Sequence, residues 1–185
     1  MTIEATQTLR EAAAIHLKDA GLEAEADSRW VWIKLGPLPF VYPNTRGRKR
    51  VLLAHDLHHL LAGYKTDLVG EAETAAWEFG TGMRDRSAVR YAIRVFGFML
   101  PRHAGRLRTA FVRGRYCQNL LGRPLDDAAL ARSVVDLRRE LGLERPVPEA
   151  SDADRREWRR LAVKAIALVW GPIVPIAVVA WWWLR

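Results

Sequence analysis

Cysteine is almost absent from this sequence: Cys117 is the only one among 185 residues. A single cysteine excludes a disulfide-stabilised scaffold and a cysteine-rich zinc module, so any metal ion must be bound by histidine, aspartate and glutamate. Lysine is scarce too, since the chain has 29 basic residues and all but five are arginines. A disordered polar chain is excluded as well, because half of the residues are hydrophobic and only 27% are charged.

The net charge of +8 is distributed unevenly along the chain. Residues 1–28 carry six acidic residues and two basic ones, a net charge of −4. Residues 84–123 carry ten arginines and one acidic residue, Asp85, a net charge of +9. Residues 165–184 carry no charge at all. The middle of the chain therefore favours an anionic partner, and its end favours an apolar environment.

Hydrophobic residues recur at helical spacing through most of the chain, which predicts an all-α fold. Glycines and prolines separate the segments, and capping residues such as Asp126 mark where helices begin. The predicted helices cover residues 3–20, 48–63, 70–80, 84–100, 102–121 and 126–141, and residues 144–151 form a linker.

Residues 29–42 differ from the rest, because aromatic and β-branched residues alternate on both sides of Gly36-Pro37. This pattern predicts a short hairpin or an extended arm. We expect three units: a metal-binding helical domain over residues 1–145, a linker and basic juxtamembrane segment over 146–160, and a hydrophobic C-terminal helix over 161–185.

The stretch HDLHHLLAGYKTDLVGEAETAAWE, residues 55–78, carries the candidate site. His55 and His59 are four residues apart, so on a helix both imidazoles can reach one cation. Asp56 is close enough to reach the same site, and a chain reversal at Gly63 would bring Glu71 beside it. Two histidines and two carboxylates suit zinc first, with iron or manganese as alternatives.

Other readings of this stretch stay open. His58 is either a hydrogen-bonding partner of the site or an exposed residue, and we expect the latter. Glu73 and Glu78 are expected to be solvated or to contact the ligands rather than the metal. The metal could be purely structural. Alternatively, His55-Asp56-x-x-His59 is a zincin motif with aspartate in place of glutamate, which would predict a hydrolase.

The motif also resembles a known family. His55-Asp56-x-x-His59, followed by eleven residues and Glu71, is similar to the hallmark of the coenzyme Q biosynthesis protein 4 family. The match covers residues 43–80, and compatible helices continue to about residue 123. The resemblance implies an all-α fold, a metal at these four side chains, association with a membrane face and a groove for a prenylated lipid. The implied reaction removes the C1 carboxyl group of a quinone precursor ring and hydroxylates that carbon.

Two segments depart from that family, the aromatic segment 29–42 and the apolar segment 165–184. The expected function is therefore metal-dependent chemistry on a prenylated quinone precursor or a similar amphiphilic molecule, with Asp56 and Glu71 as the catalytic carboxylates. A non-catalytic lipid-binding scaffold is the alternative, so the enzyme assignment, a metal-dependent oxidative decarboxylase, stays open. Other biosynthetic enzymes or a second copy of the chain would be its protein partners.

Arginines and the apolar end suggest further partners. Arg113 and Arg115 form two neighbouring guanidinium forks, which suit a substrate anion or a lipid headgroup. Solvated helix faces are the alternative explanation, and no recognition motif supports nucleic acid. Residues 165–184 are long enough to cross a bilayer, which needs about 20 residues. A surface-lying segment or a buried core helix would also fit.

Basic residues precede this apolar run from Arg155 to Lys164, and only Arg185 follows it. By the positive-inside rule, most of the protein should then lie on the cytoplasmic face of the membrane.

Overall fold

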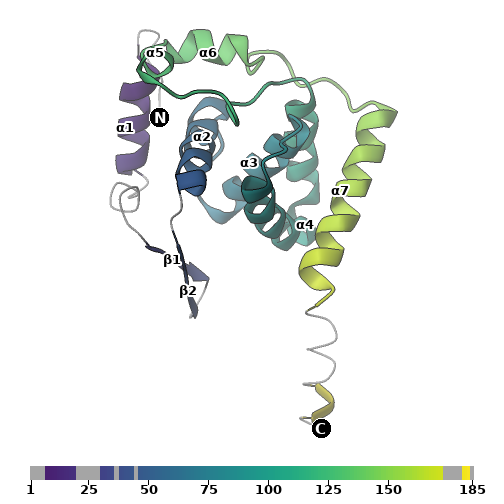
Figure 1. Ribbon diagram of the computed structural model, residues 1–185. Helices are drawn as coiled ribbons and strands as arrows, with labels where there is room; N and C mark the ends of the chain where they lie inside the picture. The colour runs from purple at the N-terminus through teal and green to yellow at the C-terminus, as the bar shows by residue number, and fades with distance from the viewer. Residues whose placement is uncertain (1–6, 20–29, 36–37, 44–45, 173–180, 184–185) are drawn as a thin grey trace.

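Helices form most of the computed structural model, which describes residues 7–19, 30–35, 38–43, 46–172 and 181–183 (Figure 1). The all-α class is thereby confirmed. The elements are α1 (Leu9–Asp19), β1 (Trp30–Leu35), β2 (Leu38–Pro43), α2 (Arg46–Ala62), α3 (Leu68–Gly80), α4 (Arg86–Arg115), α5 (Asp127–Leu130), α6 (Val134–Glu140) and α7 (Asp152–Trp170).

Helix α3 lies at the centre, between α2 and α4, and α7 packs along the other side of α4 (Figure 1). Its central position follows from its composition, because alanine, glycine and a single tryptophan, Trp77, let neighbouring helices approach closely. Trp77 is fully buried, and residues 72–78 are all buried. Phe96, Leu107 and Phe111 of α4 complete this core. The site helices α2 and α3 are therefore held from several sides.

Two glycines bring the backbones of α3 and α4 almost into contact. A Cβ atom on Gly114 would lie 2.1 Å from the carbonyl oxygen of Trp77. A Cβ atom on Gly80 would lie 2.2 Å from the carbonyl oxygen of Phe111. Any larger side chain at either position would push the two helices apart, so this contact fixes the position of α3 against α4.

Helix α4 agrees with the predicted break between a helix over 84–100 and one over 102–121. Its two helical parts meet at a kink, where His103 has the non-helical angles φ −127° and ψ 21°. Pro101 lacks an N–H and cannot donate to the carbonyl of Gly97. The indole Nε1 of Trp170 on α7 donates to that carbonyl instead, at 2.9 Å. Helix α4 also ends earlier than predicted, at Arg115.

The predicted helix over 126–141 is also wrong, because α5 and α6 are separate. Ser133 caps α6 by accepting a hydrogen bond from the amide of Asp136. The backbone beside it pairs with the start of α1, where the amide of Leu9 donates to the carbonyl of Arg132 at 2.8 Å. This pairing across more than a hundred residues competes with helical hydrogen bonds, so the helix breaks there.

Strands β1 and β2 pair antiparallel, with Trp30 opposite Pro43 and Leu35 opposite Leu38. At the other end of the chain, α7 runs through residue 160 and includes the first part of the apolar run. The rest of that run falls largely on residues 173–180 and 184, outside the described residues. Among the described residues, no helix combines the length and the hydropathy needed to cross a membrane. The division into three units stays a prediction.

The glycine contact can be tested with a matched pair of substitutions in α4. Gly114→Ala should destabilise the fold by about 1–3 kcal/mol or more, because its methyl group overlaps the backbone of α3. Gly105→Ala should be neutral or stabilise by about 0.5–1 kcal/mol, because nothing lies within 4 Å of its Cβ position. Thermal unfolding measures both, and equal midpoints for the two variants would contradict the close packing.

Candidate metal centre

Helix α2 places three histidines toward the core. His55, His58 and His59 are 7%, 0% and 1% exposed, and Leu57 and Leu61 are buried beside them. Ala54, Leu60 and Ala62 are buried too, so the buried positions cover well over half of the helix circumference and mix polar with apolar residues. Buried imidazoles need hydrogen-bond partners, and α3 supplies most of them.

The chain reversal after α2 brings α3 to the histidines. Gly63 ends α2 with a positive φ of 78°, a conformation that glycine adopts without strain. Asp67 then caps α3 by accepting a hydrogen bond from the amide of Gly70 at 2.8 Å. Glu71, Thr74 and Glu78 are spaced three and four residues apart, so they share the face of α3 that meets α2. This reversal confirms the predicted approach of Glu71 to the histidines.

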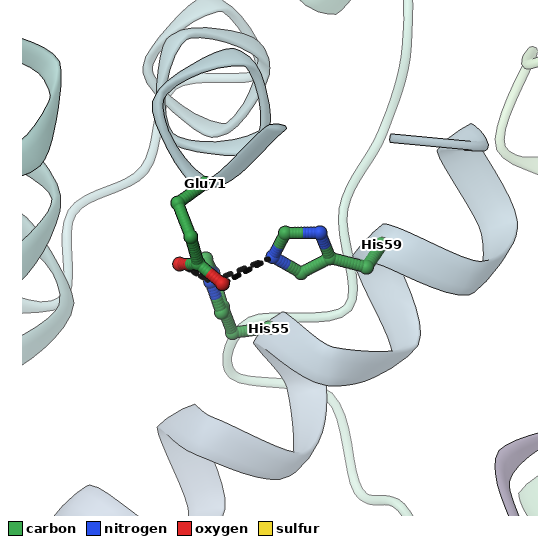
Figure 2. A group of neighbouring side chains, drawn as sticks. All are labelled: His55, His59 and Glu71. Atoms are coloured by element: carbon green, nitrogen blue, oxygen red, sulfur yellow. Dashed lines mark hydrogen bonds and ion pairs between the residues drawn. The ribbon is translucent and has the colours of Figure 1, made fainter. Parts of the chain in front are cut away.

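His55, His59 and Glu71 meet at one point (Figure 2). The Nε2 atoms of the two histidines are 3.1 Å apart. The Oε2 atom of Glu71 lies 3.1 Å from Nε2 of His55, and its Oε1 atom lies 3.3 Å from Nε2 of His59. These side chains are the group among the described residues that could hold a metal ion.

Hydrogen bonds on the far side of each ring set which nitrogen faces this point. Nδ1 of His55 lies 3.0 Å from Oε1 of Glu78, a carboxylate that accepts the Nδ1 proton. Nδ1 of His59 lies 3.4 Å from the carbonyl of Tyr64, which can only accept, and 3.2 Å from the hydroxyl of Thr74. In the tautomer with both protons on Nδ1, each Nε2 atom presents a lone pair to this point.

In that tautomer two imidazole lone pairs and a carboxylate converge on the same point, an arrangement that suits a cation. The pKa values indicate that a proton takes this place in the metal-free protein. Burial by itself would lower the pKa of His55, but the carboxylates of Glu78 and Glu71 raise it well above 6.5. Burial would raise the pKa of Glu71, but hydrogen bonds from His55 and His59 lower it to about 2.

The spacing of the three side chains fits a metal ion. Zinc bonds of about 2.0–2.1 Å in a tetrahedron place two ligand atoms about 3.3 Å apart. Octahedral bonds of about 2.1 Å place neighbouring ligand atoms about 3.0 Å apart. The distances of 3.1–3.3 Å lie within this range, so zinc, iron and manganese all fit. Three protein ligands would also leave a position for water or substrate.

Asp56 is the predicted ligand that the structure does not bring into this group. It follows His55 directly on α2, is partly buried, and its carboxylate lies outside the cluster formed by the other three side chains. Consecutive helix residues point about 100° apart, so a neighbour of an inward ligand leaves the shared face. Its assignment as a ligand and as a catalytic carboxylate stays a prediction.

His58 corrects another expectation, because it is fully buried rather than exposed. Its Nδ1 lies 2.7 Å from Oε1 of Glu78, and its Nε2 accepts the amide proton of Leu120 at 2.8 Å. Glu78 is 1% exposed, and it contacts His55 rather than the metal position. Contact with a ligand is one of the two roles expected for it. Glu78 follows Glu71 by seven residues, which is two helical turns, so both side chains lie on the same face of α3. This spacing is the sequence feature that indicates the role of Glu78.

The two arginines predicted to bind an anion contact groups of the chain itself. Arg113 donates to the carbonyls of Ala62 and Leu143 at 2.8 and 3.1 Å. Arg115 pairs with Asp154 at 3.1 Å and with Glu157 at 2.7 Å. Both groups therefore connect α4 to other helices, and anion binding there stays a prediction.

Comparison with known proteins adds no relative: no family model matches the chain, and neither the curated proteins nor the solved structures include a significant match.

The cluster predicts one zinc ion per chain, with an affinity that depends on pH. Because the pKa of His55 is raised, zinc must displace its proton, so affinity should rise as the pH increases from 6 through that pKa. Zinc titration at several pH values measures this, and His59→Ala should lose the site. Equal zinc content in the wild type and His59→Ala would contradict the assignment.

Proposed function

We propose that the protein is a metal-dependent enzyme that decarboxylates and hydroxylates the ring of a prenylated quinone precursor. The observation that carries the proposal is the meeting of His55, His59 and Glu71, which combines the spacing of the family motif with a geometry suited to one metal ion. Zinc is the first candidate, and iron or manganese the alternatives.

The reaction sets requirements for the site. The bond between ring carbon C1 and its carboxyl group breaks, carbon dioxide leaves, and a hydroxyl group takes its place. With water as the source of the hydroxyl group, this change is a two-electron oxidation, so dioxygen, reduced to hydrogen peroxide, or another two-electron acceptor must take the electrons. A bound metal ion would supply a Lewis acid that polarises an oxygen of the substrate. The carboxylate of Glu71 is a hard oxygen ligand, so a metal ion bound to it would also favour the oxygen atoms of a substrate ring.

One side of the cluster is accessible. The side chain of Glu71 is 22% exposed, whereas those of His55 and His59 are 9% and 1% exposed. Tyr91 of α4 is 42% exposed, and its ring lies edge-on to His55 at 6.3 Å between centroids. A flat substrate ring would approach from this side, where an aromatic side chain borders the ligands.

The hydrolase alternative has less support. A zincin needs the carboxylate beside its first histidine to activate the metal-bound water. Asp56 holds that sequence position, but its side chain is one methylene group shorter than the glutamate of the motif and reaches less far toward such a water. A lipid-binding scaffold remains the competing proposal, and it is separated by the same assay, because a scaffold would bind the prenylated molecule without releasing carbon dioxide.

The decarboxylation proposal predicts a specific loss in Glu71→Gln. With a prenylated hydroxybenzoate labelled in its carboxyl group, the zinc-, iron- or manganese-loaded wild type should release labelled carbon dioxide, and Glu71→Gln should lower the rate at least 100-fold. Glu73→Gln is the matched control, since Glu73 lies on the same helix but pairs with Arg106 at 2.8 Å, away from the cluster. Turnover that survives in Glu71→Gln, or none with any metal, would overturn the proposal.

We also propose that the protein associates with the cytoplasmic face of a membrane, where a prenylated substrate resides. The exposed face of α7 supports this, because it changes character along the helix. Its first half exposes Arg155, Arg156, Arg159 and Arg160, whereas Val163 and Leu168 in its second half are 68% and 59% exposed. Cationic and apolar groups on one face suit anionic headgroups and the acyl region beneath them.

Binding to vesicles tests the membrane proposal. The full chain should sediment with vesicles that contain anionic phospholipid, whereas a chain that ends at Pro172 should bind more weakly and be released by salt. The truncation is placed after α7 because Ala165 is buried and Trp170 contacts α4. A shorter chain would lose part of the fold. Equal vesicle binding by the two chains would contradict a contribution of residues 173–185 to membrane association.

A further inference from the structure

One carboxylate oxygen connects two histidines beneath the candidate metal centre. Oε1 of Glu78 lies 3.0 Å from Nδ1 of His55 and 2.7 Å from Nδ1 of His58. Glu78 is 1% exposed and His58 is fully buried. Neither residue belongs to the group that meets the metal position, so their arrangement requires a separate explanation.

The proton positions in this network follow from a backbone amide. The amide of Leu120 can only donate, and it lies 2.8 Å from Nε2 of His58. Nε2 of His58 must therefore be an acceptor, so the single proton of the neutral ring is on Nδ1. That proton is donated to Glu78. When a metal ion binds Nε2 of His55, the proton of that ring is on Nδ1, and the same Oε1 atom of Glu78 accepts it.

We infer that Glu78 and His58 are positioning residues of the metal centre, which fix the tautomer and the ring orientation of His55. This inference rests on the proposed function, since it requires that His55 binds a metal ion. A carboxylate that accepts the far proton of a metal-binding imidazole orients the ring and increases its basicity toward the metal. His58 holds that carboxylate in place from the other side.

Packing alone does not account for Glu78. Burial of a carboxylate is costly unless it is compensated, and an apolar side chain of similar size would fill the same space at no such cost. The two Nδ1 protons supply this compensation, and the charge of Glu78 acts on the ligand His55. The network also reaches the loop after α4, because Leu120 is buried and its amide is the group that orients His58.

Glu78→Gln tests this role, because it keeps the shape of the side chain and removes its charge. The zinc affinity of the full chain, measured by competition with a chromophoric chelator, should fall about 10- to 100-fold in Glu78→Gln. Glu73→Gln removes one charge from the same helix without contacting the histidines, so its affinity should stay within about twofold of the wild type.

A second measurement uses the wild type and does not depend on how the variant folds. In the zinc-loaded protein, long-range ¹H–¹⁵N NMR spectra of the histidines should show Nδ1 protonated in both His55 and His58. An Nε2 proton on either ring, or an unchanged zinc affinity in Glu78→Gln, would overturn the inference and leave the proposed function intact. A wild type that binds no divalent metal would overturn the proposed function and this inference together.

Discussion

The structure of this protein depends on one set of contacts, in which two carboxylates of α3 lie against three imidazoles of α2. Glu78 and His58 are almost completely buried, and Glu71 is the only one of the five with appreciable contact to solvent. Buried charges require partners, so neither helix can shift along the other without leaving a carboxylate or an imidazole unpaired. The same requirement makes the cluster a group that could hold a cation.

The rest of the fold holds these two helices in register. The glycine contact between α3 and α4 leaves no room for sliding or rotation at the C-terminal end of α3. Arg113 binds the last carbonyl of α2, and Asp67 caps the start of α3. The candidate ligand atoms lie 3.1–3.3 Å apart, and a small displacement of either helix would separate them.

Aromatic contacts connect the site helices to the exposed face of α7. Phe79, next to Glu78, packs edge-on against Phe96 of α4 at 5.7 Å, and Phe96 packs against Trp158 of α7 at 5.5 Å. Trp170 adds the hydrogen bond that Pro101 leaves unmade. If α7 binds a membrane surface as proposed, this packing would hold the metal centre at a constant position relative to the lipid, as a substrate with a long isoprenoid chain requires.

Local spacing in the sequence determined much of this protein: the helical class, the pairing of His55 with His59 and the reversal at Gly63 that brings Glu71 to them. These features depend on helical periodicity and on the backbone freedom of glycine, which act over a few residues. Only the tertiary structure decided the role of His58, whose partner is an amide 62 residues away. The break before α6 likewise depends on the start of α1, and the carbonyl of Gly97 that Pro101 leaves without a donor is satisfied by Trp170 of α7. A buried polar group is satisfied by whatever donor or acceptor the fold places beside it, and that neighbour is not encoded in the spacing of nearby residues.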